Sequence, residues 1–183
     1  MRTINIIVIS FMLSACSSMV NVDYDRNTDF SSYKTYSIDA KPVRISADTR
    51  INSSFMQQRV VNELNATLSK KGFENVNKNA DLKIKYFLDT KREVATQDSG
   101  VVSIGLGSSS HHSAVGFGFN IPIGETTTID SLVMTVDIIS TKTNELLWRG
   151  TLGYSLYEGA GPETYTKLVN ELVDEILEKF PPK

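Results

Sequence analysis

Cysteine and histidine are scarce in this 183-residue chain, and each scarcity excludes a class of protein. Cys16 is the only cysteine, so no disulfide can form inside the chain and the fold has to rely on an apolar core. The only two histidines, His111 and His112, are adjacent, and adjacent side chains of a strand point to opposite faces. Such a pair is poorly placed to chelate one ion. We therefore expect no metal site and no cofactor.

Long apolar runs and an excess of one charge are also missing. A transmembrane helix needs about 20 apolar residues, whereas the apolar run 6–13 is short and contains Ser10. The chain has 19 Lys and Arg against 21 Asp and Glu, a net charge of −2. A nucleic-acid-binding protein would show a basic stripe, so we expect no nucleic acid partner.

Catalytic motifs are absent as well. The sequence has no Gly-x-Ser-x-Gly elbow and no phosphate-binding Gly-Lys-Ser/Thr loop. Two Gly-x-Gly sequences, at 105–107 and 116–118, partly match a dinucleotide-binding motif. They lie inside strand-like runs and do not begin a helix, which argues against a dinucleotide site. We expect no catalytic residues and a protein that is not an enzyme.

The N-terminus carries the most informative pattern that is present. Arg2, an apolar stretch and small residues before a cleavage point are typical of a secretory signal. Leu13-Ser14-Ala15-Cys16 resembles the lipobox of bacterial lipoproteins, in which the Cys thiol receives a diacylglyceryl group and a peptidase cuts before it. We expect a signal peptide over 1–15, lipid attachment at Cys16, a tether over 16–27 and one domain over 28–183.

The residues after Cys16 indicate in which membrane the protein is anchored. Ser17 and Ser18 follow the cysteine, and the Asp that retains lipoproteins in the inner membrane of enteric-type bacteria is missing. We expect a lipid-anchored protein on the periplasmic leaflet of the outer membrane, whose membrane contact is the lipid itself.

The first half of the chain predicts one strand and one helix. Alternating residues and aromatic content predict a strand over 30–38. A helix is expected over 51–70, with Asp48 as the N-cap and Gly72 in a left-handed cap after the helix. One apolar stripe of this helix should be buried, and its members are Phe55, Met56, Val60, Leu64 and Leu68.

The second half predicts three strands and a helix. Strands are expected over 82–88, 127–140 and 146–156, the last two forming an antiparallel hairpin through the turn 141–145. The strongest helical pattern runs over 162–180, from Pro162 until Pro181 forbids continuation. The fold class that follows is α+β: a two-layer sandwich with a mostly antiparallel sheet and both amphipathic helices on one face.

A Gly-rich segment over 100–124 separates the two halves. Two period-two apolar runs surround a polar Ser/His tip, which describes a hairpin with one apolar face. Three interpretations are open: the hairpin packs on the domain's own core, it is an arm that binds a partner or the lipid surface, or it is a loop without fixed pairing. The candidate partner-binding side chains are Val115, Phe117 and Phe119.

Trp148-Arg149-Gly150 is the most distinctive short cluster. A single Trp in a strand is usually a core or rim anchor. Arg149 should project from the opposite face and pair with Asp137 or Asp39, and Asp137 is expected on the solvent face of its strand.

The order of several short motifs resembles a family of bacterial lipoproteins, domain of unknown function 4136 (DUF4136). These motifs are Asp23-Tyr24-Asp25, Thr28 to Tyr36, Lys70 to Phe73, Ala80-Asp81-Leu82, Asp137-Ile138, Leu147 to Gly150, and Phe180-Pro181-Pro182. The resemblance covers nearly all of the mature chain. It implies an envelope-anchored α+β domain and brings no catalytic residues.

Two functional hypotheses follow. The leading one is a non-enzymatic, lipid-anchored module that binds another envelope protein, with the segment 100–124 as its binding surface. The alternative is a periplasmic carrier of a small apolar ligand or lipid, which needs a sizeable apolar cavity between sheet and helices. Large side chains dominate both helix stripes, so we expect a filled core.

Overall fold

The computed structural model describes residues 20–95, 127–157 and 159–182. Its elements are β1 (Asn21–Tyr24), the 3-10 turn η1 (Phe30–Ser32), β2 (Thr35–Ile38), β3 (Arg44–Ile45), α1 (Ser54–Lys70), β4 (Glu74–Asn75), β5 (Leu82–Ala95), β6 (Thr127–Ser140), β7 (Leu146–Leu156) and α2 (Pro162–Glu178).

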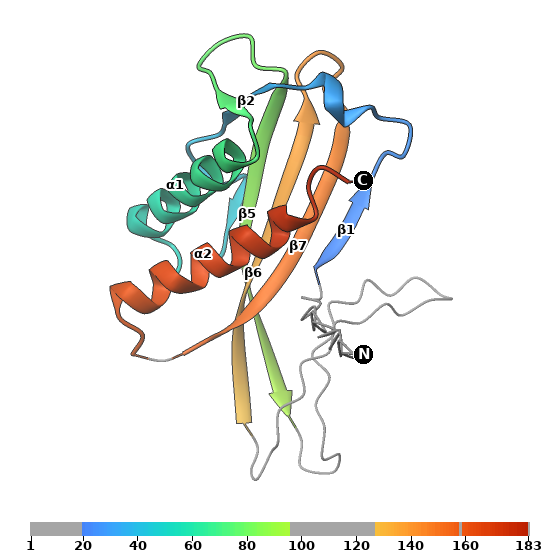
Figure 1. Ribbon diagram of the computed structural model, residues 1–183. Helices are drawn as coiled ribbons and strands as arrows, with labels where there is room; N and C mark the ends of the chain where they lie inside the picture. Colours follow the sequence, from blue (N-terminus) through green and yellow to red (C-terminus); the bar gives the residue numbers. More distant parts are fainter. Residues whose placement is uncertain (1–19, 96–126, 158, 183) are drawn as a thin grey trace, which may run out of the picture.

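Seven strands form one sheet in the order β1-β7-β6-β5-β2-β4, and β3 also pairs with β5. The pairs β1–β7, β7–β6 and β6–β5 are antiparallel, whereas β2 and β3 run parallel to β5 and β4 runs parallel to β2. Both helices lie against the same face of the sheet and pack against each other, while β5 and β6 extend past them at one end (Figure 1). The predicted α+β class with a mostly antiparallel sheet is confirmed. The Gly-rich hairpin that was part of that prediction lies outside the described residues.

The core lies between the sheet and the two helices. Alternate side chains of β6, from Leu132 to Ile138, are fully buried on the helix side. The α2 stripe faces them with Val169, Leu172, Val173, Ile176 and Leu177, all at 0 % exposure. Burial of each such side chain stabilises the fold by about 1.5–3 kcal/mol. The period-two and three-four patterns therefore identified the buried faces of β6 and α2.

Helix α1 differs from its prediction at the N-terminal end. Ser53 is the N-cap and accepts a hydrogen bond from the backbone N–H of Met56 at 3.1 Å. Asp48 instead closes a preceding turn, where its backbone oxygen accepts from the N–H of Ile51. Phe55 is 69 % exposed, because it precedes Met56 by one position and therefore lies about 100° around the helix from the stripe of Met56, Val60 and Leu64.

The C-terminal end of α1 agrees with its prediction. Gly72 has φ +87°, a conformation that glycine adopts without the steric cost of a Cβ. The N–H of Phe73 donates to the backbone oxygen of Leu68, and that of Gly72 donates to Ser69. These two bonds form a Schellman motif, which turns the chain back and places Phe73 against the core.

The predicted strand over 30–38 is wrong in its first half. Asp29 accepts a hydrogen bond from the backbone N–H of Ser31 and caps the short turn η1, so that only Thr35–Ile38 is extended. A capping aspartate offers the backbone an alternative to the sheet, and this local bond outweighs the alternation of side chains.

Part of the segment expected as a tether over 16–27 belongs to the sheet. Residues Asn21–Tyr24 form β1, an edge strand in which Val22 lies opposite Gly150 and Tyr24 opposite Trp148. Val22 packs against the core while the other three residues of β1 are exposed. A four-residue strand with one apolar contact gives too short an alternation to be recognised from the sequence.

Candidate functional site

The residues that the sequence singled out as sites lie outside the described residues. These are the lipid-attachment residue Cys16 and the partner-binding candidates Val115, Phe117 and Phe119, together with His111 and His112. The structure neither places them nor brings them together.

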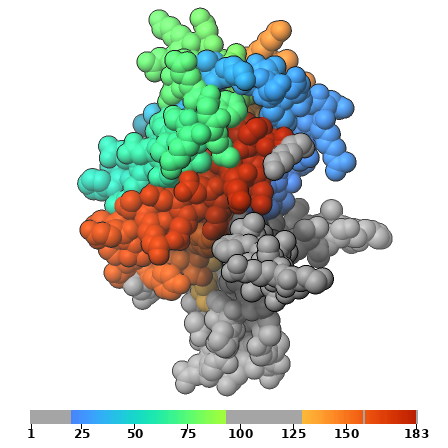
Figure 2. Space-filling view, viewed as in Figure 1, coloured from blue at the N-terminus to red at the C-terminus, as the bar shows by residue number. Residues whose placement is uncertain are grey.

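A different site emerges where three distant chain segments meet. The loop between β1 and β2, the residues that end α1 and the C-terminal tail surround one surface groove of about 630 Å³. Figure 2 shows the blue N-terminal segment, the green end of α1 and the dark red C-terminus converging at this end of the molecule. The groove is lined by Tyr24, Asp25, Arg26, Thr28, Asp29, Phe30, Ser31, Tyr33, Lys34, Lys71, Gly72, Phe73, Pro181 and Pro182.

The floor of this groove is aromatic and rigidly supported. The rings of Phe30 and Phe73 lie 5.7 and 5.4 Å, centroid to centroid, from the ring of Phe180. Phe180 in turn lies 5.4 Å from Trp148, which is fully buried. Tyr24 meets Phe30 edge to face at 6.5 Å. Edge-to-face aromatic pairs add about 0.5–1.5 kcal/mol beyond the burial of area, so this floor keeps its shape.

Two carboxylates on the rim are occupied by local turns. Asp25 accepts hydrogen bonds from the backbone N–H of Asn27 at 2.9 Å and the hydroxyl of Thr28 at 2.8 Å. Asp29 accepts from the hydroxyl and the backbone N–H of Ser31 at 2.7 and 3.0 Å. Hydrogen bonds to the charged form lower the pKa of both carboxyls, from Asn27 foremost at Asp25 and from the Ser31 hydroxyl foremost at Asp29. Both therefore stay ionised and committed to the loop.

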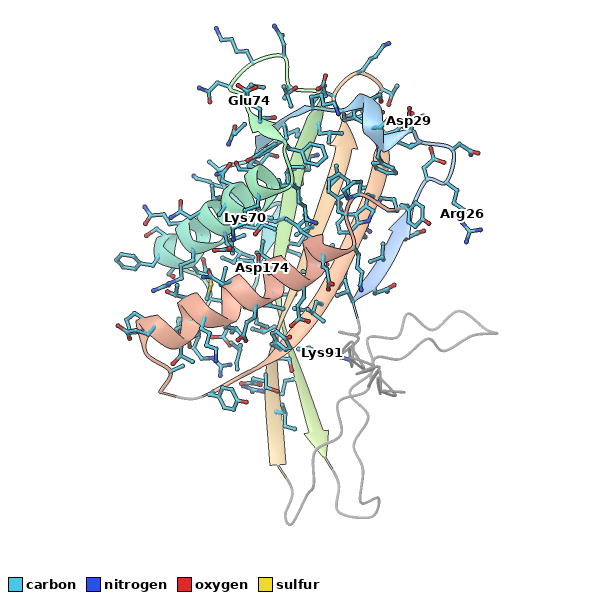
Figure 3. All side chains as sticks on the ribbon, viewed as in Figure 1. Arg26, Asp29, Lys70, Glu74, Lys91 and Asp174 are labelled. Atoms are coloured by element: carbon cyan, nitrogen blue, oxygen red, sulfur yellow. The ribbon has the colours of Figure 1, made fainter. Side chains whose placement is uncertain are left out.

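Three cations on the rim form no ion pair with a carboxylate of the described residues. These are Arg26, Lys34 and Lys71, and all three are exposed. Figure 3 shows Arg26 and Asp29 on the β1–β2 connection, Lys70 at the end of α1 and Glu74 in β4. The groove thus combines an apolar floor with a rim of three cations and two carboxylates, whose net charge is +1.

Asp81 fixes the segment that carries Lys34. One of its carboxylate oxygens accepts from the backbone N–H groups of Lys34 and Thr35 at 3.0 and 2.8 Å and from the hydroxyl of Thr35 at 2.8 Å. The backbone hydrogen bond from Lys34 is the largest of the effects that lower the pKa of Asp81. The backbone N–H of Asp81 donates back to the Thr35 hydroxyl at 2.9 Å. This reciprocal pairing holds the start of β2 beside the start of β5.

The face of the sheet away from the helices carries two paired arginines on either side of Phe87. Arg149 donates to both carboxylate oxygens of Asp137 at 2.6 Å each, and Arg44 donates to Asp89 at 2.9 and 2.5 Å. The two guanidinium carbons lie 6.0 and 5.7 Å from the centre of the Phe87 ring. The predicted Arg149–Asp137 pair is confirmed. Asp137 was expected to face solvent but is 5 % exposed, because the guanidinium covers it.

A second charge cluster stands where β5 and β6 extend beyond the helices. Arg50 pairs with Asp48 and Asp130 at 2.5 and 2.6 Å, and Arg92 pairs with Asp130 at 2.7 Å. Hydrogen bonds from Arg92 and then Arg50 lower the pKa of Asp130 to about 2. The two arginines and two aspartates of this cluster balance in charge.

Metal-ligating side chains do not cluster within the described ranges. There, no group of three or more His, Cys, Asp or Glu side chains is placed to hold a metal ion. In the same part of the chain, no helix combines the length and apolar character needed to cross a membrane.

Comparison with known proteins identifies relatives of the whole domain. A family model described as "Domain of unknown function (DUF4136)" matches residues 20–182. No curated protein matches the chain.

Solved structures align with the chain at low sequence identity. A PDZ domain protein from Parabacteroides distasonis aligns with 90 % of this chain at 15 % identity and a TM-score of 0.56. The chain spans only 35 % of that protein's length. The PelC dodecamer from Paraburkholderia phytofirmans aligns over 87 % of this chain and 98 % of its own, at 10 % identity and a TM-score of 0.45. Lipoprotein GNA1162 from Neisseria meningitidis aligns over 79 % of this chain and 99 % of its own, at 10 % identity and a TM-score of 0.42.

The groove was missed by sequence reasoning, although its signal was present. Three of the family-like motifs of the sequence contribute to the groove: the stretch Asp23 to Tyr36, the run Lys70 to Phe73 and the ending Phe180-Pro181-Pro182. Their convergence on one surface depends on the sheet order and the helix crossing, which no local pattern contains.

Proposed function

The chain belongs to the DUF4136 family, and from this premise we propose that it is a lipid-anchored, periplasm-facing bacterial lipoprotein that acts as a non-enzymatic interaction module. The observation that carries the proposal is the lipobox-like Leu13-Ser14-Ala15-Cys16, whose cysteine lies five residues before the first strand at Asn21. Two or more acyl chains hold a protein stably on a membrane.

The short connection limits how far the domain can stand from its anchor. Five residues span at most about 18 Å when fully extended. Because β1 runs from Asn21 towards Tyr24, its far end carries the groove. A domain anchored through Cys16 would present that groove away from the bilayer, where another envelope protein can reach it.

Several features favour binding over catalysis or carriage. Within the described residues, no group of three or more His, Cys, Asp or Glu is placed to hold a metal ion, and no histidine is present there to act as a general base. Between helices and sheet, the space needed by a carrier is filled by side chains such as Met56, Leu64 and Leu172, each at 0 % exposure. An interaction module is the role that these features support.

The anchor is tested with Cys16→Ser. This variant should lose incorporation of labelled palmitate, keep its signal peptide and fail to fractionate with the outer membrane. Normal lipid labelling and membrane retention of Cys16→Ser would refute the anchored assignment.

The interaction is tested by photo-crosslinking in cells from Phe117, with Phe55 as the matched control because that side chain is 69 % exposed on α1. Capture of one discrete envelope protein from Phe117 and not from Phe55 would support the segment 100–124 as the binding surface. Lipid adducts alone from Phe117 would overturn its role in protein binding.

A further inference from the structure

We propose that the groove between the β1–β2 loop, the end of α1 and the C-terminal tail binds an extended acidic segment of a partner protein, with one apolar side chain of that segment on the aromatic floor. This inference deepens the proposed role as an interaction module and rests on it. It names a site and a ligand chemistry within the described residues.

The size of the groove suits such a segment. Its volume of about 630 Å³ falls in the range of about 300–1,000 Å³ that is typical of ligand sites. Phe30 and Phe73 provide the apolar contact, and both rest on Phe180. A pocket floored by supported rings is the setting in which one buried side chain of a partner contributes most to affinity.

Charge complementarity selects an acidic partner. The rim cations Arg26, Lys34 and Lys71 have no ion pair with a described carboxylate. The rim carboxylates Asp25 and Asp29 are engaged by Asn27, Thr28 and Ser31 in their own loop. These neutral donors leave both carboxylates charged, so the three cations and two carboxylates of the lining sum to +1. This local excess contrasts with a net charge of −2 for the chain.

Two other anionic classes fit less well. Duplex nucleic acid is held by many phosphate contacts along a basic stripe, and three cations around one groove do not make such a stripe. An anionic membrane surface is disfavoured by the position of the groove, which lies at the Tyr24 end of β1 and not at the Asn21 end that leads to Cys16.

The local structure explains how these cations are presented. The Schellman motif at Gly72 turns the chain sharply, so Lys71 projects at the helix end while Phe73 turns inwards. Asp81 pins the backbone of Lys34. A preorganised rim lowers the entropic cost of binding.

The test uses the mature lipidated protein in detergent and fluorescein-labelled peptides of about ten residues, which are about 33 Å long when extended and so reach beyond the groove. One peptide has Asp and Glu around a single Phe, a second has Lys in place of the acids, and a third has Ala in place of Phe. We expect the acidic Phe peptide to bind, the Ala peptide to bind about tenfold more weakly because the buried ring is lost, and the Lys peptide not to bind.

Charge-reversed variants locate the site. Lys34→Glu combined with Lys71→Glu should raise the Kd for the acidic peptide by about tenfold or more. The matched control combines Lys41→Glu with Lys167→Glu, which changes the net charge equally outside the groove and should leave the Kd within about twofold. Raising NaCl from about 50 to about 300 mM should weaken binding to the unmodified protein.

Chemical-shift mapping on the unmodified protein keeps the test decisive if a variant folds poorly. The acidic peptide should shift the amide signals of 24–34 and 71–73 ahead of those of β6. Equal binding of the acidic and Lys peptides, an unchanged Kd in the Lys34/Lys71 variant, shifts confined to other surfaces, or preference for anionic vesicles would each overturn the proposal. Crosslinking from Phe117 is a separate measurement. The proposal that the groove binds an acidic segment can therefore be refuted while the proposed role as an interaction module is supported.

Discussion

Gly150 lies directly beneath the indole ring of Trp148. A Cβ atom on Gly150 would stand 2.3 Å from Cη2 of that ring and 2.8 Å from Cγ2 of Ile176. Both residues belong to β7, and their side-chain positions point to the helix face of the sheet. The missing side chain at Gly150 makes room for Trp148 to fold along the strand beneath Phe180, so this glycine supports the floor of the groove.

Gly150→Ala should therefore destabilise the protein by about 1–3 kcal/mol, since overpacking forces the ring or the backbone to move. Urea unfolding followed by circular dichroism measures the change. Gly161→Ser is the matched control, because a Cβ there meets only Glu163 at 3.5 Å and a serine at this N-cap of α2 adds a capping oxygen. A Gly150→Ala protein as stable as the unmodified one would mean that Trp148 lies elsewhere.

The environment of Trp148 is open to direct spectroscopic measurement, since it is the only tryptophan in the chain. The side chain is fully buried and its Nε1–H finds no hydrogen-bond partner. We expect short-wavelength emission that acrylamide hardly quenches, and a large red shift on unfolding. Long-wavelength emission from the native protein would contradict this packing.

Trp148→Phe should cost less stability than the roughly 3–5 kcal/mol typical of Trp→Ala. The ring is partly replaced, and the buried unpaired N–H, whose desolvation costs about 1–3 kcal/mol, is removed. Urea unfolding of Trp148→Phe beside Trp148→Ala measures both effects.

The two arginine pairs on the open face of the sheet should differ in strength. Asp137 exposes 7 % of its side chain and Arg149 46 %, whereas Asp89 and Arg44 expose 35 % and 66 %. Exposed pairs contribute about 0.2–1 kcal/mol, and a carboxylate removed from water gains more from its partner. Double-mutant cycles with Ala should give a larger coupling for Asp137–Arg149 than for Asp89–Arg44. Equal couplings would contradict this ranking.

Acid should weaken the charge cluster around Asp130. The carboxyl has its pKa lowered to about 2, foremost by hydrogen bonds from Arg92 and Arg50. A carboxyl whose pKa is lower in the folded than in the unfolded state stabilises the fold above the unfolded value of about 4, and this contribution is lost as pH falls towards the folded value. The stability difference between the unmodified protein and Asp130→Asn should therefore shrink from pH 5 to pH 2. A difference that stays constant over this range would show that Asp130 is not paired as described.

Much of the fold was predictable because its strongest patterns are local. Apolar residues at three-four spacing over Pro162 to Phe180 and alternation over Thr127 to Ser140 determined α2, β6 and the faces that they bury. Gly72 specified the end of α1 through its positive φ. Each of these signals is contained within a few residues, and burial of the apolar face reinforces it.

Other elements were mispredicted because a local hydrogen bond or a distant partner outweighed the pattern. Asp29 bonds to Ser31 and shortens the strand expected over 30–38. Ser53 replaces Asp48 as the cap of α1. Strand β1 exists only because β7 offers it an edge. A four-residue strand has no stability of its own until that edge is present.

By itself, the sequence determined the α+β class, the two helix faces, the family resemblance and the expectation of a lipid anchor at Cys16. The tertiary structure alone decided that Arg26, Lys34 and Lys71 stand around one aromatic floor, and that Asp137 is covered by Arg149. The physical reason is that periodicity and capping act between residues a few positions apart. The groove depends on contacts between segments more than 100 residues apart, such as that of Phe30 with Phe180, and only the assembled fold brings these together.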